Sequence, residues 1–155
     1  MKTLAMSAVI AGLLASASAM AQPAANEKHA NWAAKVRKAN FTLLGHNMGP
    51  IGGMLKGRAK FDAQTVAEKA TMINYLANMI ADTSKVDTSK FKVETEALDK
   101  IWKDKADYAK KVQALIDASQ KVKEIALTAP ESEVMKAMGK MGKTCGDCHD
   151  SYKMD

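Results

Sequence analysis

The sequence lacks several features that would place it in common functional classes. Beyond its first residues, no apolar run is long enough to span a bilayer, so no membrane-crossing segment is expected there. The formal charge is +6, but the lysines are spread along the chain and no known motif accompanies them, which argues against nucleic-acid binding. No nucleophile–base pair and no phosphate-binding glycine loop is evident, so we do not expect an enzyme. Cysteine is also scarce, with both copies in one short segment.

The N-terminal segment has the three parts of a secretory signal peptide. Met1-Lys2 provides a positive start, residues 4–14 form an uncharged apolar run, and Ala19-Met20-Ala21 provides an A-x-A cleavage site. We therefore predict removal of residues 1–21 and one mature domain over residues 22–155. The expected destination is an exported compartment, most simply a bacterial periplasm. The alternative is a retained membrane anchor, which the short apolar run disfavours.

The segment Cys145-Gly146-Asp147-Cys148-His149 is the most specific feature of the chain, because C-x-x-C-H is the attachment site of a c-type haem. Positions i, i+3 and i+4 share one helix face, so the two cysteines can bond one porphyrin while His149 reaches its iron. Other interpretations are a solvated tail with two spare thiols, a redox C-x-x-C and half of a zinc site. The redox motif would be expected near a βαβ pattern and zinc would need a fourth ligand, and neither is visible. We predict one covalent haem c per chain.

Composition and spacing predict an all-α fold. Alanine, lysine, leucine, methionine and glutamate dominate, and apolar residues recur at helical spacing in four segments. Glycines and a proline at 49–53 should break or kink the first helix, Asp62 should cap the second, and Pro130 should begin the last. One face of the first helix should carry Trp32, Val36, Leu43 and Asn47. We predict an antiparallel four-helix bundle with the covalent haem c between its helices, which span about 27–48, 62–82, 98–122 and 130 onwards, with a polar loop at 83–92.

This pattern, with the haem motif in the last helix, resembles the cytochrome c′ family. The similarity covers almost the whole mature chain and includes the segments 37–44, 55–57, 61–63, 101–102 and 148–153. The resemblance implies that His149 is the axial iron ligand and that Cys145 and Cys148 form the haem thioethers. It also implies that Arg37 approaches a haem propionate and that Lys153 lies beside the proximal face, where relatives often carry arginine.

The resemblance is most informative at Phe41, four residues after Arg37. In this family the residue at that position covers the distal face of the iron, and low-spin members carry a methionine ligand there. Phenylalanine has no atom to donate, so the resemblance implies five-coordinate, high-spin iron under an apolar lid that admits nitric oxide or carbon monoxide. Met48 and His46 lie further along the same helix, and either could instead swing onto the iron.

These observations are consistent with two functions. The first is a periplasmic gas-binding haem protein that can also transfer one electron, and the alternative is a low-spin electron-transfer cytochrome with no physiological gas ligand. A mildly basic surface could steer an acidic redox partner protein. Peroxidase chemistry would need a distal acid–base residue, whereas the stripe that contains Phe41 offers apolar side chains. The resemblance also implies a homodimer formed through the first two helices.

Overall fold

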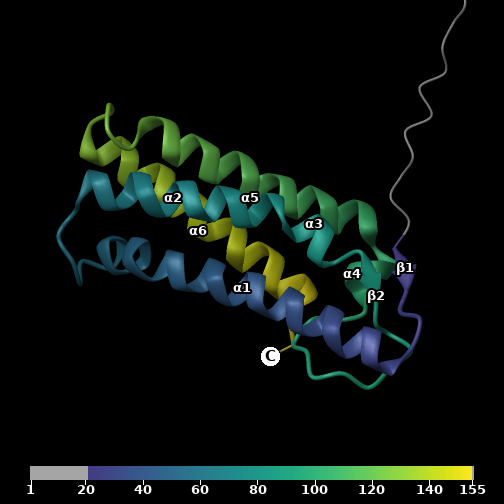
Figure 1. Ribbon diagram of the computed structural model, residues 1–155. Coiled ribbons are helices and arrows are strands. Elements are labelled where there is room, and N and C mark those ends of the chain that lie inside the picture. The colour runs from purple at the N-terminus through teal and green to yellow at the C-terminus, as the bar shows by residue number, and fades with distance from the viewer. Residues whose placement is uncertain (1–20, 155) are drawn as a thin grey trace, which may run out of the picture.

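The computed structural model describes residues 21–154, which form four long helices and several short elements (Figure 1). Each long helix packs against the next one along the chain in an antiparallel arrangement, which confirms the predicted all-α bundle. The predicted leader, residues 1–21, lies outside the described residues except for Ala21. No helix within the described residues is both long and apolar enough to cross a membrane. The four long helices are α1 (Glu27–Leu55), α2 (Ala63–Asn78), α5 (Lys105–Ile125) and α6 (Glu131–Tyr152).

Helix α1 is longer than predicted, because Gly49-Pro50 does not end it. A proline inside a helix removes the hydrogen bond to the carbonyl four residues upstream. That carbonyl belongs to His46, and both His46 and Pro50 are exposed, so water can satisfy it. The helix ends at Leu55, and Gly57 follows with a φ of 66°, the left-handed conformation typical of a helix stop. The predicted end near residue 48 was wrong.

The face that α1 buries also differs from the predicted one. Arg37, Leu44 and Ile51 are buried and recur at a spacing of seven residues, two helical turns apart. Trp32 and Leu43, which were expected on a shared face with Val36 and Asn47, are 67% and 49% exposed. Only Asn47 of those four belongs to the buried face.

Capping residues set the starts of the other helices. Asp62 accepts a hydrogen bond from the Thr65 backbone N–H at 2.6 Å, as predicted, and this interaction lowers the pKa of the Asp62 carboxyl. Pro130 immediately precedes α6, also as predicted. The expected second helix divides into α2 and a short α3 (Ile80–Thr83). The expected third helix divides into α4 (Lys100–Lys103) and α5, because Asp104 leaves the helical conformation and caps α5.

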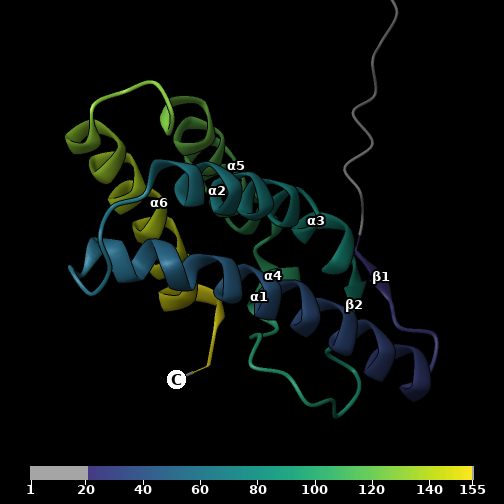
Figure 2. The same cartoon turned by 60° about the vertical axis from the view of Figure 1, so that its left-hand side comes forward.

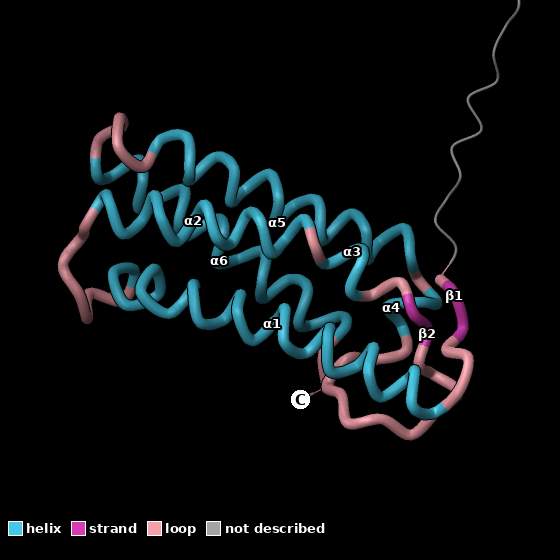
Figure 3. Tube along the Cα trace, in the orientation of Figure 1, coloured by secondary structure: helices cyan, strands magenta, loops and turns pink. Residues whose placement is uncertain are grey.

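A short parallel pair of strands was not predicted. Strand β1 (Gln22–Pro23) pairs with β2 (Val86–Asp87) at the end of the bundle. Residues 88–99, which we call the strap, connect β2 to α4, pass beneath α1 and return beside the C-terminus (Figure 3). An antiparallel bridge between Ala97 and Lys153 joins the strap to the residues that follow α6.

The interior of the bundle has two different halves along its length. One half lies toward the end of the bundle that carries both the α1–α2 and the α5–α6 connections (Figure 2). Its side chains fill the space between the helices, and those with no exposed surface include Ile51, Val66, Ala70, Val122, Val134 and Met138. In the other half, toward the strap, the same helices surround a cavity.

Candidate haem site

The cavity has a volume of about 440 Å³ and lies between α1, α2, α5 and α6, with strap residues on one side. Its wall draws on segments that are distant in the sequence. The structure thus brings every residue predicted for the site to one place: Arg37, Phe41, Cys145, Cys148, His149 and Lys153 all line the cavity.

Helix α6 presents the C-x-x-C-H motif to this cavity. Cys145 and Cys148 are half-buried free thiols that pack against the core, and His149 lies at the exposed edge. Burial raises the pKa of both thiols, and nearby Lys111 partly opposes that effect at Cys148. Because the three motif residues fall at i, i+3 and i+4 of one helix, their side chains can reach a single porphyrin.

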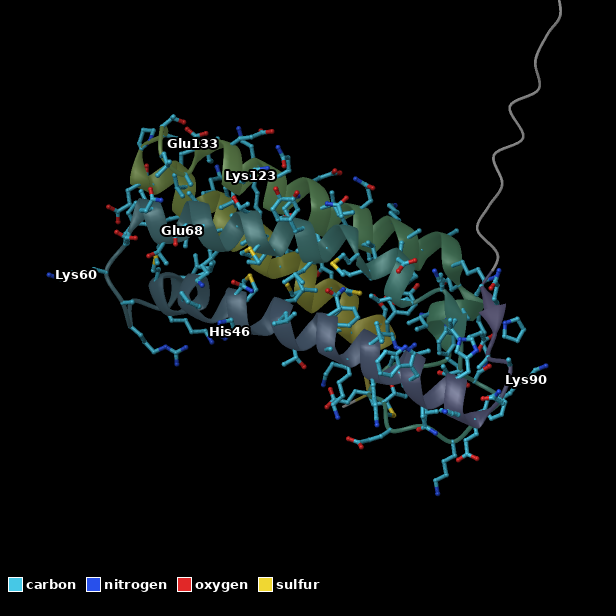
Figure 4. All side chains as sticks on the ribbon, viewed as in Figure 1. His46, Lys60, Glu68, Lys90, Lys123 and Glu133 are labelled. Carbon is cyan, nitrogen blue, oxygen red and sulfur yellow. The ribbon has the colours of Figure 1, made fainter. Side chains whose placement is uncertain are left out.

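The wall contributed by α1 is apolar next to the motif. Phe41 is half-buried and packs against the core, and Leu44 beside it is buried. Met48 also lines the cavity, and its methyl carbon is 4.0 Å from where a Cβ on Gly142 would lie, which directs it toward α6. His46 is exposed and does not line the cavity (Figure 4). Of the two additional ligands considered, only Met48 is therefore at the site.

Arg37 forms the polar end of the cavity and is 2% exposed. Its Nη2 donates to the hydroxyls of Thr88 at 3.5 Å and Thr95 at 3.4 Å, and its guanidinium lies 5.1 Å from the ring centroid of Trp102. Its Nη1 is buried without a hydrogen-bond partner, and within residues 21–154 the guanidinium forms no ion pair. Burial lowers the pKa of Arg37, although an arginine stays charged in proteins. A buried cation in this state requires an anion.

These features fit a covalently held haem. Two thiols and an imidazole on one helix face match its vinyl groups and iron, and the apolar walls match its ring. The unpartnered Nη1 of Arg37 matches a propionate, since a guanidinium and a carboxylate form strong charge-assisted hydrogen bonds. Cys145, Cys148, His149 and Arg37 could therefore hold the group together.

Lys153 lies at the mouth of the cavity, where it is exposed. Its Nζ is 3.1 Å from the Glu96 carboxylate on the strap. Lys38, which lies at the same mouth, pairs with Glu94 of the strap at 2.6 Å. A lysine of α1 and the lysine that follows α6 thus both form ion pairs with the strap.

Sequence reasoning missed two groups of residues at the site. Tyr152 is buried, donates to the Asp107 carboxylate at 2.7 Å and packs edge-on against Tyr108 with ring centroids 5.2 Å apart. Its position three residues after His149 placed it on the face of the motif, so helical spacing could have found it. Thr88 and Thr95 lie in the strap, and nothing local in the sequence indicates that they meet Arg37.

A four-helix bundle with a C-x-x-C-H motif facing such a cavity defines a helical c-type haem protein. Comparison with known families agrees, because the family described as "Cytochrome C'" matches residues 32–153. The chain therefore belongs to the cytochrome c′ family, which binds covalent haem c. This confirms the resemblance and the cofactor predicted from the sequence.

Individual relatives are similar over most of their length. Cytochrome c′ of Cereibacter sphaeroides is 31% identical over 144 residues, which is 92% of this chain and 96% of that protein. The structure of cytochrome c prime from Shewanella frigidimarina is 34% identical with a TM-score of 0.76, covering 84% of this chain and 100% of that one. A ferrous variant of cytochrome c prime from Alcaligenes xylosoxidans with bound NO is 27% identical with a TM-score of 0.69, covering 79% and 94%.

Proposed function

We propose that this chain is a periplasmic haem protein with five-coordinate, high-spin iron, which binds nitric oxide or carbon monoxide at an apolar distal site. The observation that carries the proposal is Phe41, a side chain without a ligand atom, which lines the cavity from α1 while His149 lines it from α6. Haem iron supplies a binding site for diatomic gases and a one-electron couple. Cys145 and Cys148 would hold the group covalently, and His149 would supply a nitrogen ligand to its iron.

The surroundings of Phe41 support a preference for neutral gases. Leu44, Ile73 and Leu115 line the same cavity, and apolar walls disfavour water and anions. Phe41 is only half-buried, so its ring has room to change rotamer when a diatomic ligand enters. The ferrous relative with bound NO supports gas binding as chemistry that this fold can perform.

The polar end of the cavity would hold the carboxylates of the group. We assign one propionate contact to Arg37, whose buried Nη1 lacks a partner. Lys153 keeps a positive charge at the proximal mouth, but an ammonium lacks the planar fork of a guanidinium, and its ion pair with Glu96 already engages it.

Optical spectra of the purified holoprotein test the proposal. They should be recorded in the ferric and ferrous states, and in the ferrous state under carbon monoxide and under nitric oxide. High-spin bands that shift with either gas are the expected result. A sharp low-spin ferrous spectrum that neither gas changes would contradict five-coordinate iron.

The alternative, a low-spin electron-transfer cytochrome, is favoured by one observation: the Met48 thioether lies at the cavity. A Met48→Leu variant separates the two functions. If Met48 were the sixth ligand, the variant would change from low-spin to high-spin. Under the main proposal the spectrum of Met48→Leu matches that of the unsubstituted protein, because the iron is already five-coordinate.

We also propose that the chain is not an enzyme. The α1 side chains next to the motif, Phe41 and Leu44, can neither donate nor accept a proton, so they cannot assist cleavage of a peroxide bond. Turnover of nitric oxide or hydrogen peroxide by the holoprotein should therefore not exceed that of free haem at equal concentration. Catalytic consumption well above that rate would contradict this part of the proposal.

We propose that the chain forms a homodimer through α1 and α2. We also propose that its basic surface docks an acidic redox partner protein. Large apolar side chains are exposed on these two helices, among them Trp32, Leu43, Met72 and Tyr75, and Met79 is exposed directly after α2. Contiguous exposed apolar surface is typical of interaction sites. Light scattering coupled to gel filtration should give a dimer mass for the unsubstituted protein and a monomer mass for Trp32→Glu combined with Met79→Glu.

A further inference from the structure

Four consecutive residues of the strap, 94–97, contact both α1 and the residue that follows α6. Glu94 pairs with Lys38 of α1 at 2.6 Å, and Thr95 accepts from Arg37 of α1. The next two residues contact Lys153: Glu96 pairs with its Nζ at 3.1 Å, and Ala97 forms the backbone bridge to it. The strap therefore links α1 to the residues that follow the haem-binding helix.

The hydroxyl of Thr95 has one hydrogen-bonding capacity still unused. Its oxygen accepts from Arg37 Nη2 at 3.4 Å and from the Ala97 backbone N–H at 3.1 Å, which occupies both lone pairs. A threonine hydroxyl also carries one donor hydrogen. Nothing in the described part of the chain accepts that hydrogen, and Thr95 lines the cavity.

Arg37 is fixed so that its second terminal nitrogen is available beside Thr95. The hydroxyls of Thr88 and Thr95 engage Nη2, and the face of Trp102 lies 5.1 Å from the guanidinium carbon. These contacts leave Nη1 buried and unpartnered. Thr88 is itself 2% exposed, so it is a rigid support for Nη2.

We propose that Thr95 donates a second hydrogen bond to the same haem propionate that Arg37 binds, and that Thr88 is a positioning residue for Arg37. The proposal rests on the proposed haem in this cavity. One carboxylate accepts hydrogen bonds from Arg37 Nη1 and from the Thr95 hydroxyl, since a carboxylate has about four acceptor positions. The propionate thereby holds the strap against α1, and the strap holds Lys153 through Glu96.

The test compares holoprotein variants that remove or retain the Thr95 hydroxyl. Thr95→Val removes the donor, Thr95→Ser retains it, and Arg37→Gln removes the charge-assisted contact. Thr71→Val is the matched control, because the Thr71 hydroxyl donates to the Ala67 carbonyl inside α2 at 2.8 Å and lies outside the cavity lining. The readouts are the propionate bending band in resonance Raman spectra and the midpoint reduction potential.

We expect Thr95→Val to shift the propionate band and to lower the reduction potential, because a less compensated carboxylate favours ferric iron. Thr95→Ser and Thr71→Val should match the unsubstituted protein, and Arg37→Gln should give a larger shift than Thr95→Val. Thr88→Val should move the band in the same direction as Arg37→Gln, but by less, because it acts only through Arg37.

If Arg37→Gln shifts the propionate band but Thr95→Val leaves it where it is in the unsubstituted protein, the role of Thr95 is overturned. An unchanged band in both variants would overturn the Arg37 contact as well. A chain without covalent haem would instead overturn the proposed function, so the two failures are distinguishable.

A second measurement, NMR of the unsubstituted ferrous protein with bound carbon monoxide, needs no substitution and so does not depend on whether a variant folds. Nuclear Overhauser contacts between the Thr95 methyl group and the propionate methylene protons are expected, and their absence would overturn the proposal.

Discussion

The same four helices build two unlike halves of one bundle. In the half toward the α1–α2 connection, Val66, Val134 and Met138 have no exposed surface and fill the interior. In the half toward the strap, Phe41 and Met48 are only half-buried and border a cavity of about 440 Å³. Side chains alone complete the first half, whereas the second half is shaped for a bound group.

Along the helix axis, the packed half therefore contributes mainly stability, and the cavity half contributes the functional site. Close packing in one half lets the helices remain together while the other half keeps polar and unpaired groups that packing alone would not retain. Arg37 is the clearest case, because a buried guanidinium without an anion opposes folding until a carboxylate is bound. Substitutions in the two halves should therefore have different consequences.

The largest effect is expected when the covalent attachment is removed. The double variant Cys145→Ala, Cys148→Ala cannot form thioethers, so acid–acetone extraction should remove all haem, whereas the unsubstituted chain should retain it. Each single variant should keep one thioether and show the corresponding change in its pyridine haemochrome spectrum. Haem that resists extraction from the double variant would show that the attachment site lies elsewhere.

The next effect concerns the apolar wall of the cavity half. Phe41→Met places a thioether where relatives of low-spin type carry their ligand, so the ferric and ferrous spectra should become low-spin and carbon monoxide should bind less readily. Phe41→Leu is the matched control, because it changes size without adding a ligand atom, and it should remain high-spin. An unchanged spectrum for Phe41→Met would mean that Phe41 does not face the iron.

The packed half should respond in stability and not in spectrum. Met138→Ala removes a side chain with no exposed surface, and such truncations cost about 2–5 kcal/mol in the free energy of unfolding. Met48→Ala, at the half-buried position beside the cavity, should lower the free energy of unfolding by less, and it should also leave the spectrum unchanged if the iron is five-coordinate. Denaturant unfolding and optical spectra of the two variants measure both quantities. An altered haem spectrum in Met138→Ala would mean that the two halves are coupled.

The sequence predicted the four long helices well and the strap poorly. The C-x-x-C-H motif and helical spacing placed Cys145, Cys148 and His149 on one face of α6, because those relations are local. The start of α2 at Asp62 followed from local capping chemistry for the same reason. The end of α1 was predicted wrongly because Pro50 was taken as a stop, whereas its exposure makes it tolerable and Gly57 supplies the stop.

The remaining features depend on contacts between distant residues. Thr88 and Thr95 meet Arg37 only because the strap passes beneath α1, and no periodicity indicates such a path. The pairing of β1 with β2 likewise joins residues 22–23 to residues 86–87, which are distant in the sequence. The placement of Arg37 and Phe41 at the cavity relied on the family resemblance, since spacing alone shows only that they share a stripe of α1.

The smallest effect is expected at Tyr152, which ties the cavity half together through its hydrogen bond to Asp107 at 2.7 Å. Tyr152→Phe should lower the free energy of unfolding by about 1.5–3 kcal/mol near pH 7, because a hydrogen bond to a carboxylate is lost. Tyr75→Phe is the matched control, since Tyr75 is 61% exposed and should change stability little.

The contribution of Tyr152 should also depend on pH in a defined direction. Burial, followed by the hydrogen bond to Asp107, raises the pKa of Tyr152, and burial also raises the pKa of Tyr108. Above about pH 10 the unfolded chain loses these phenolic protons while the folded chain keeps them, so stability falls as pH rises. Below that pH the contribution is fully present. Unfolding curves at pH 7 to 11 should therefore show the gap between the unsubstituted protein and Tyr152→Phe narrowing toward alkaline pH, and a gap that widens would contradict a raised pKa.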